Sequence, residues 1–517
     1  MYQFNPKIIK RKSSSATLPA PIGGLNDRDS LAEMPPTDAV ILENWWVTPS
    51  MLVTRPGSQN WVTGFTNPVE TLAEYDPPTG ASKLFAASNG GIYDCTAGGA
   101  LPAESVSGLS NNRWQDAAMT TAAGNFLYLF NGADKPQLFN GATWVSVDGT
   151  STPAITGITD TKAIIQGCVF KNRLWLVEKN TLCVWYLPIQ SIGGLAVKID
   201  LGAVFERGGS IVGMYTWTLD SGTGSDDMAV FLTSNGEVAV YSGSDPTVST
   251  GFNLIGVYFL GRPMGRRPCV KFGGDLLIIC ELGLFPLSQG LLTATIDRAA
   301  ALTDKIQNLI SSVISAYSTN FGWEVIPYPN VNALLLNVPA GNGANYQLIQ
   351  NTISKAWTKF TGWNANTFID SKLGFFFADA TAVRKAWVGD TDNTSMINSD
   401  ALQAFSAFGA PAQNKSFTMV KPYIRSDGNP SILYGINGDY NPQDVNGALN
   451  YIPSAGMIWG AMSWGSMVWG GSMRQISNYS TVGGIYKAAA LRMKSQNNGS
   501  TCEWAATDFL FETGGFL

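Results

Sequence analysis

Short apolar runs separated by turns that contain Gly or Asn recur along the chain from about residue 84 to residue 390. The clearest example spans residues 228–241, where two apolar runs flank Ser-Asn-Gly. An Asn-Gly pair between two strand-like runs is the strongest short-range signal for a β-hairpin. This segment therefore predicts two antiparallel strands, and the other copies predict a series of hairpins. The seven copies begin at Leu84, Phe126, Leu174, Met228, Leu276, Leu334 and Phe375.

The spacing of these copies indicates the type of all-β fold. Successive copies begin 41 to 58 residues apart, close to the length of a β-propeller blade of about four strands. We therefore expect an all-β propeller of about seven irregular blades (roughly six to eight) over residues 71–400. Two stacked β-sandwiches, which also place short strands between turns, stay open as the alternative. The chain has no Gly-His pair of the WD40 type and no S-x-D-x-G-x-T-W box, so a propeller here belongs to a divergent class.

One stretch departs from the strand pattern. Leu302, Ile306, Leu309, Ile310 and Val313 recur at three- and four-residue spacing, which is typical of an amphipathic helix. The pattern predicts one short helix from about residue 302 to 317, inserted between two repeats, with one face packed on the propeller rim.

The two ends of the chain carry strand-like runs without the repeat. Residues 1–70 and 401–517 are rich in Gly, Pro and Asn, and we expect them to form two arms that pair with each other. The apolar runs are far shorter than the roughly 20 residues of a membrane-spanning helix. The N-terminus is basic but lacks the apolar core of a signal peptide. We therefore expect a soluble protein that is made in the cytoplasm, with no membrane span.

The amino-acid composition argues against several classes of function. The chain has no histidine, the commonest general base and metal ligand. Its net charge of −5 argues against a surface that wraps nucleic acid. The six cysteines show no C-x-x-C spacing and favour buried free thiols in a reducing compartment. We expect no enzyme activity, no catalytic residues, no metal and no cofactor.

Residues 389–400 come nearest to a metal-binding motif. Asp390 and Asp392 match the first two ligands of a calcium loop, but Ser395 and Ala401 stand where an EF-hand has Gly and Glu. A polar turn is the preferred interpretation. A pair of carboxylates at glycosidase distance stays open in a chain with 38 acidic residues, although no motif supports it.

Two basic clusters are candidates for contacts with partners. Because the whole chain is acidic, docking to a carboxylate-rich protein surface is favoured over contact with DNA. The candidate residues are Lys10, Arg11 and Lys12 near the N-terminus, and Arg262, Arg266 and Arg267 within residues 261–268.

Residues 457–473 contain three Trp-Gly pairs spaced five residues apart, together with several Met residues. Neither the helix period of 3.6 nor the strand period of 2 places all three Trp side chains on one face, so an irregular loop is expected. Trp and Met are enriched at protein contacts, and we expect this loop to contact a partner, with core packing as the alternative. The candidate contact residues are Trp459, Met462, Trp464, Met467 and Trp469.

Short motifs at both ends of the chain carry a resemblance to a known family. They are PIGGLNDRDS at 21–30, MPPTDA at 34–39, LENWW at 42–46, TRPG at 54–57, TDKIQ at 303–307 and FLFETGG at 509–515. With these motifs the chain resembles the tail nozzle, or tail stabilisation, proteins of short-tailed bacteriophages. The motifs are short and mostly structural, and they lie in both arms and within the repeats.

The resemblance implies a fold and a role. The fold would be a propeller beside a β-rich platform built from both chain ends. The role would be that of a structural virion protein: a homo-oligomeric ring, usually a hexamer, that lies below the head-to-tail adaptor ring in the virion tail. The ring would retain the genome, let double-stranded DNA pass through its lumen without tight binding, and meet tail fibre or tail tip proteins. Assembly would take place in the host bacterial cytoplasm, and no catalytic residues transfer with the resemblance.

Two other classes remain open. A propeller of the tail that binds or cleaves host glycans would show exposed aromatic platforms, with paired carboxylates for cleavage. A bacterial scaffold propeller would be a stable monomer. The Trp-Gly repeat is a departure from the family to which the resemblance assigns no role.

Overall fold

A computed structural model describes residues 13–220, 225–248, 250–290, 298–428, 430–445 and 473–514. The chain folds into two compact units. The platform comprises residues 1–57, 349–360 and 388–517, and the propeller comprises residues 58–348 and 361–387. By this division residues 58–70, which we expected in the N-terminal arm, fall in the propeller, and residues 349–360 and 388–400, which we expected in the propeller, fall in the platform.

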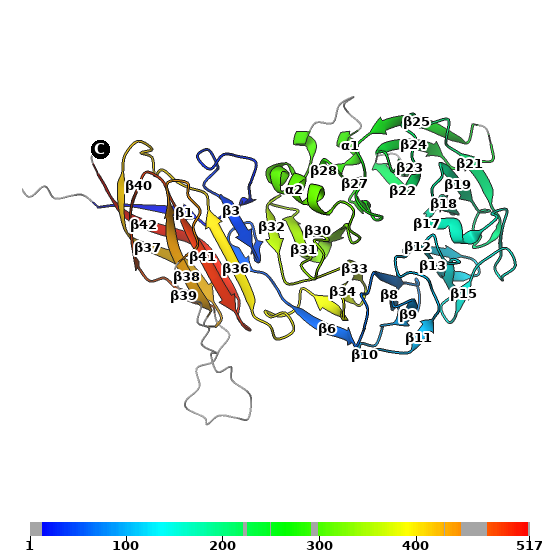
Figure 1. The fold of residues 1–517 in the computed structure, drawn as a ribbon, viewed down its shortest axis with the longest axis horizontal. Coiled ribbons are helices and arrows are strands. Elements are labelled where there is room, and N and C mark those ends of the chain that lie inside the picture. The colour runs from blue at the N-terminus through cyan, green and yellow to red at the C-terminus, as the bar shows by residue number, and fades with distance from the viewer. Residues whose placement is uncertain are drawn as a thin grey trace, which may run out of the picture. The chain divides into compact units, whose positions relative to one another are not determined.

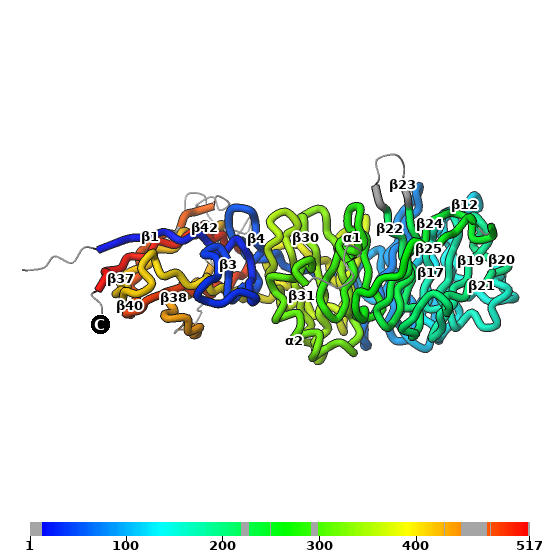
Figure 2. Tube along the Cα trace, turned by 90° about the horizontal axis from the view of Figure 1, so that it is seen from above, coloured from blue at the N-terminus to red at the C-terminus, as the bar shows by residue number. Residues whose placement is uncertain are grey.

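The propeller consists of sheets that stand around a common axis, as predicted (Figure 1). Seen edge-on, they occupy the right-hand part of Figure 2. Blade 1 contains β7 (Thr71–Tyr75), β8 (Lys83–Ser88), β9 (Gly91–Asp94) and β11 (Glu104–Val106). Blade 2 contains β12 (Gln115–Thr121), β13 (Gly124–Phe130), β14 (Gln137–Phe139) and β15 (Trp144–Ser146). Blade 3 contains β17 (Ile164–Phe170), β18 (Arg173–Glu178), β19 (Cys183–Tyr186) and β21 (Val197–Asp200).

Four further blades complete the ring. Blade 4 contains β22 (Ile211–Asp220), β23 (Ser225–Thr233), β24 (Glu237–Gly243) and β25 (Phe252–Phe259). Blade 5 contains β26 (Cys269–Phe272), β27 (Asp275–Cys280) and β28 (Gly283–Pro286). Blade 6 contains β29 (Glu324–Tyr328), β30 (Ala333–Val338) and β31 (Tyr346–Asn351). Blade 7 contains β33 (Thr367–Ser371), β34 (Gly374–Ala378), β35 (Ala382–Ala386) and β6 (Ser58–Thr63), with β10 (Gly99–Ala100) parallel to β6. A small parallel pair, β16 (Ile155–Thr156) and β20 (Gly194–Leu195), lies beside these blades.

The ring closes in two ways. The first strand of each blade lies next to the first strand of the following blade, and β33 lies next to β7. In addition, β6, which precedes all seven repeats, pairs antiparallel with β35 as the outer strand of blade 7. The last blade is therefore completed by the first strand of the propeller in the sequence.

The predicted repeats correspond to the second strands of the blades. Each of the seven predicted starting positions falls in the second strand of a blade: β8, β13, β18, β23, β27, β30 and β34. These strands are apolar on both faces because each blade packs against two neighbours. In β13, for example, Leu127 and Leu129 pack toward blade 1 whereas Tyr128 and Phe130 pack toward blade 3. A buried cluster likewise joins blade 7 to blade 1, so the sandwich alternative does not apply to this unit.

The inserted helix lies where the pattern predicts, between blades 5 and 6, but it is shorter. α2 spans Gln307–Tyr317, and a 3-10 turn, η3 (Asp304–Ile306), precedes it. Its buried residues are Ile310, Val313 and Ile314, and it packs beside β28 of blade 5. The other short helical segments are α1 (Leu287–Gly290), η1 (Thr161–Ala163), η2 (Arg298–Ala300) and η4 (Pro329–Val331). Within the described ranges, no helix has the length and apolarity needed to cross a bilayer.

The platform contains two sheets built from both chain ends. In the first, β1 (Ser13–Pro19) pairs antiparallel with β42 (Cys502–Thr513), which joins the predicted arms. This sheet also contains β4 (Trp45–Val47), β5 (Leu52–Thr54), β37 (Lys415–Ser426), β39 (Arg474–Ile476) and β40 (Ser480–Tyr486). The second sheet has nine strands, in the order β29-β30-β31-β32-β3-β36-β41-β38, with β2 paired to β3. Its platform strands are β2 (Gly24–Leu25), β3 (Asp38–Glu43), β32 (Trp357–Phe360), β36 (Ile397–Gln403), β38 (Ser431–Gly438) and β41 (Ala489–Asn497). Burial alternates along β37, β41 and β42, as expected for strands with one face toward a core.

A buried arginine holds together the segments by which the platform chain leaves and returns. Arg55 Nε donates to Asn44 Oδ1 at 2.8 Å, and its Nη1 donates to Pro56 O at 2.9 Å and to Asp392 Oδ1 at 3.1 Å. The Gly57 N–H donates to Gly389 O at 2.7 Å. A Cβ at Gly57 would run into the backbone around residue 391, so this close approach requires glycine. We call this arrangement the Arg55 clasp.

Arg55→Ala should destabilise the platform strongly. The Arg55 side chain is 1% exposed, and its removal would take away the cation that pairs with Asp392 and the donor to Asn44 Oδ1. We expect a loss of about 3–5 kcal/mol in the free energy of unfolding. The control is Arg425→Ala on β37, whose half-exposed side chain pairs with Glu503; it should lose less than about 1 kcal/mol. Urea unfolding followed by Trp fluorescence measures both variants, and equal losses would show that the clasp contributes no special stability.

Candidate functional site

One side chain, Arg267, links most of the blades at the propeller axis. It lies just before β26, and its Nη1 donates to Glu324 Oε1 at 3.0 Å and to Thr367 Oγ1 at 2.6 Å. Its Nη2 donates to Thr71 Oγ1 at 3.2 Å and to Trp114 O at 2.8 Å. These partners stand at the starts of β29, β33, β7 and β12. The guanidinium therefore joins the first strands of blades 6, 7, 1 and 2 to its own blade 5.

The partners of Arg267 are themselves held in place. Glu324 Oε2 accepts a hydrogen bond from the Phe368 N–H at 2.9 Å. Burial raises the pKa of the Glu324 carboxyl, and the charge of Arg267 acts against that shift. Arg267 is therefore the cation that balances the Glu324 carboxylate at the axis.

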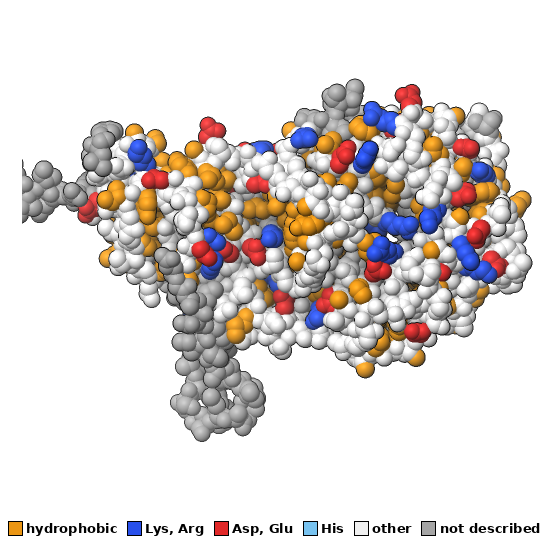
Figure 3. Space-filling view, viewed as in Figure 1, with side chains coloured by type: hydrophobic (Ala, Val, Ile, Leu, Met, Phe, Trp, Pro, Cys, Tyr) orange, Lys and Arg blue, Asp and Glu red, His pale blue; other side chains and the backbone are white. Residues whose placement is uncertain are grey.

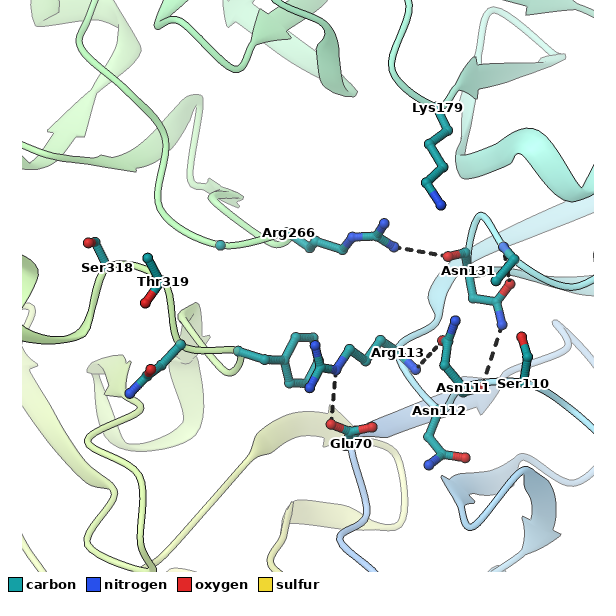
Figure 4. A pocket seen from close by; sticks show the side chains of 14 residues that line it. Glu70, Ser110, Asn111, Asn112, Arg113, Asn131, Lys179, Arg266, Ser318 and Thr319 are labelled. Carbon is teal, nitrogen blue, oxygen red and sulfur yellow. Dashed lines mark hydrogen bonds and ion pairs between the residues drawn. The ribbon is translucent and has the colours of Figure 1, made fainter.

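A pocket lies beside the strand starts that Arg267 joins, and Figure 4 shows the side chains that line it. Its volume is about 530 Å³, and its walls come from the loops before β7, β12, β26 and β29 and from the turns after β13 and β18. We call it the mouth pocket. Figure 3 shows Lys and Arg side chains gathered over the middle of the propeller on the face in view. The lining residues are Glu70, Ser110, Asn111, Asn112, Arg113, Asn131, Ala133, Lys179, Gly265, Arg266, Ser318, Thr319, Asn320 and Phe321.

The mouth pocket carries an excess of positive charge in an acidic chain. Arg113, Lys179 and Arg266 face a single carboxylate, Glu70, so two positive charges remain in excess. Arg113 Nε donates to Glu70 Oε1 at 2.9 Å, and its guanidinium lies 4.4 Å from the centre of the Phe321 ring. Arg113 is therefore neutralised by Glu70 and fixed against an aromatic ring.

The other two cations have only backbone carbonyls as hydrogen-bond partners among the described residues. Arg266 Nη1 donates to Asn131 O at 3.1 Å, and Lys179 Nζ donates to Gly132 O at 3.0 Å. Burial, with the nearby charges of Arg113 and Arg267, lowers the pKa of the Arg266 guanidinium, which still stays charged at neutral pH. A part-buried cation among other cations favours a nearby anion.

The three arginines predicted as one cluster therefore lie in three environments. Arg267 joins the first strands of the blades at the axis, and Arg266 lines the mouth pocket. Arg262 lines a separate hollow with Arg207, Asn235, Phe259 and Glu281, where Arg207 stacks on the Phe259 ring at 3.8 Å. Lys10, Arg11 and Lys12 lie outside the described residues, as do Trp459, Met462, Trp464, Met467 and Trp469 of the Trp-Gly segment.

The acidic loop considered for calcium takes part in the Arg55 clasp instead. Asp392 pairs with Arg55, and Thr501 Oγ1 donates to Asp390 Oδ1 at 3.3 Å. In the parts of the chain that the structure describes, no three His, Cys, Asp or Glu side chains converge as a metal site would require. All six cysteines are free thiols, and burial raises the pKa of Cys95, Cys280 and Cys502 to about 12.

Sequence reasoning missed Glu70, Arg113 and Lys179 as pocket residues. They are far apart in the chain and come from three different blades. The sequence does carry a signal by which these pocket residues could be found. Each of them lies just before the first strand or just after the second strand of its blade. These positions share one end of every propeller blade, so charges there converge on the axis.

Comparisons with known proteins add no assignment. No family model matches the chain, and no curated protein matches it. Among solved structures, the chain is similar to YCF48 bound to D1 peptide, with 10% identity over 69% of this chain and 100% of that chain and a TM-score of 0.36. It is similar to BBS1N in complex with ARL6DN, with 11% identity over 68% and 94% of the two chains and a TM-score of 0.33. A third is a glycoside hydrolase family 43 arabinoxylan arabinofuranohydrolase from Bacillus subtilis, with 11% identity over 88% and 96% and a TM-score of 0.26. At these TM-scores the propeller assignment depends on the seven sheets themselves.

Arg267→Met should destabilise the propeller. The Arg267 and Glu324 side chains are 19% and 10% exposed, so the substitution would leave a mostly buried carboxylate without its cation. We expect the free energy of unfolding to fall by about 3 kcal/mol. The control, Arg262→Met, removes an exposed cation from the same loop and should change it by less than about 0.5 kcal/mol.

A second variant separates charge from packing. The double variant Arg267→Met with Glu324→Gln should recover part of the loss, because no buried charge is left unpaired. Chemical unfolding of the full chain measures all variants. If Arg267→Met proved as stable as Arg262→Met, the axial role of Arg267 would be wrong.

Proposed function

We propose that this chain is the nozzle subunit of a short-tailed bacteriophage, a structural protein without enzyme activity. In this proposal, copies form a ring below the head-to-tail adaptor that retains the genome and lets DNA pass during ejection. The ring would also contact tail fibre or tail tip proteins. The proposal starts from the resemblance carried by the motifs at both chain ends.

The observation that carries the proposal is the packing of those motifs. LENWW and TRPG supply Asn44 and Arg55 of the Arg55 clasp. Trp45 of LENWW packs against Trp504 of β42 with ring centres 6.3 Å apart. FLFETGG contributes Phe509 to the same strand, which pairs with β1. The motifs at the two chain ends thus lie in one platform, which agrees with the arrangement that the resemblance implies and supports the proposal.

The outer edge of the propeller offers a surface for a neighbouring copy. The last strands of blades 3 and 4 and the adjoining β20 carry exposed apolar side chains, including Leu195 at 62% and Ile255 at 53% exposure. Exposed apolar patches of this kind commonly mark protein contacts. In a ring, a second copy of this chain would cover them.

The first expected outcome concerns the number of copies. Native mass spectrometry of tails released from virions should show several copies of this chain, as a closed ring requires. The purified chain can remain monomeric until the adaptor templates the ring, so the isolated protein is no test. A single copy in each assembled tail would contradict the proposal.

The second expected outcome concerns DNA. Because the net charge is −5, the isolated chain should bind a 30-base-pair duplex with a dissociation constant weaker than about 1 µM at physiological salt. A passing genome must not be held by many phosphate contacts. Fluorescence anisotropy at two salt concentrations measures this. Tight binding that falls steeply with salt would reject a lumen that DNA slides through.

A further inference from the structure

We propose that the mouth pocket is a binding site for an acidic sugar, with the sugar carboxylate held by Lys179 and Arg266. The inference concerns the propeller alone and does not depend on assembly of a ring. It assigns binding and no bond cleavage, because Glu70, the one carboxylate that the described residues place in the pocket wall, is held by Arg113.

The charges define where a carboxylate would lie. Arg266 and Lys179 reach toward adjacent backbone carbonyls, those of Asn131 and Gly132. Their ammonium and guanidinium groups thus converge on one turn from two different blades (Figure 4). An oxyanion between them would accept charge-assisted hydrogen bonds from both groups, the strong class of such bonds. Neither cation has a carboxylate partner among the described residues, so no ion pair has to be broken first.

The other side chains of the pocket wall can form hydrogen bonds with the hydroxyl groups of a polyol. Ser110, Ser318 and Thr319 present hydroxyl groups, and Asn111 and Asn112 present amides. The amide oxygen of Asn111 accepts the Arg113 N–H and that of Asn112 accepts the Gly90 N–H. Their amide nitrogens have no bond to the described residues and remain available as donors to sugar hydroxyls. The volume of about 530 Å³ lies within the usual range for small-ligand pockets and far exceeds that of a simple anion.

Other anionic ligands fit less well. A peptide would need an apolar anchor pocket. Of the described residues that line the wall, only Ala133 and Phe321 are apolar, and Arg113 covers one face of Phe321. Duplex DNA is bound by extended rows of cations on a surface, whereas here three cations line a concave pocket. The combination of two available cations with neutral hydrogen-bonding groups favours a carboxylated sugar.

The test is calorimetric titration of the full chain with trigalacturonate, beside neutral galactotriose, triglutamate and inorganic phosphate. We expect trigalacturonate to bind best and galactotriose to bind at least about tenfold more weakly, since one charge-assisted contact changes affinity by that order. Lys179→Gln should weaken trigalacturonate binding by about tenfold without changing the melting temperature, because Lys179 is exposed. Lys372→Gln, which removes an exposed cation elsewhere on the propeller, is the control and should bind as the unmodified chain does.

Each other result would overturn the inference. Absence of trigalacturonate binding, or equal binding of the charged and neutral trisaccharides, would reject an acidic-sugar site. Stronger binding of triglutamate would identify a peptide site, and a preference for phosphate would identify a simple anion site. Equal effects of Lys179→Gln and Lys372→Gln would place the binding outside the mouth pocket.

Discussion

Closing a ring of seven blades is the constraint on which the rest of this structure depends. A blade cannot bury both of its faces unless it has a neighbour on each side, so the last blade must find the first. Here β6 pairs with β35 and completes blade 7, and a buried cluster joins that blade to blade 1. The strand that closes the ring therefore comes from the beginning of the chain. In the sequence, β6 directly follows Gly57 of the Arg55 clasp, and residues 388–392 follow β35.

The propeller axis is the second place where the blades constrain one another's positions. The starts of the first strands of blades 6, 7, 1 and 2 bring polar groups together at one end of the propeller. A single guanidinium can serve several of them because it offers five donors in one plane. Arg267 uses two of its nitrogens to reach four partners from four blades. An apolar residue at this position would remove the donors to Glu324 Oε1 and to the Trp114 carbonyl and the charge that faces Glu324, which explains a charged side chain at this place.

The elements that could be predicted from the sequence are those whose pattern of apolar and turn residues lies within one short segment. The hairpin at 228–241 and the other second strands were predictable because both of their faces are buried and the turns between them need Gly or Asn. Gly236, for example, has a φ of 88° and lies against Gly261. The start of α2 was predicted too early because the apolar residues Leu302 and Ile306 continue the helical pattern through a 3-10 turn. The separate roles of Arg262, Arg266 and Arg267 could not be predicted, because only tertiary structure decides which one reaches Glu324.

The mouth pocket exists only in the closed ring, and this links its chemistry to the stability of the fold. Lys179 comes from blade 3, Arg266 from the loop that begins blade 5, and Arg113 from the loop before blade 2. If the ring of blades were open, these cations would be far apart. Their mutual repulsion therefore arises when the ring closes, and it opposes ring closure. An anion held between Lys179 and Arg266 removes that repulsion and binds only the closed form. By linkage, such a ligand stabilises the closed propeller by an amount that grows with the logarithm of its concentration. Closure of the ring brings the starts of the strands together around Arg267. It also brings the cations of the mouth pocket together at that end of an otherwise acidic chain, where they attract an anionic group.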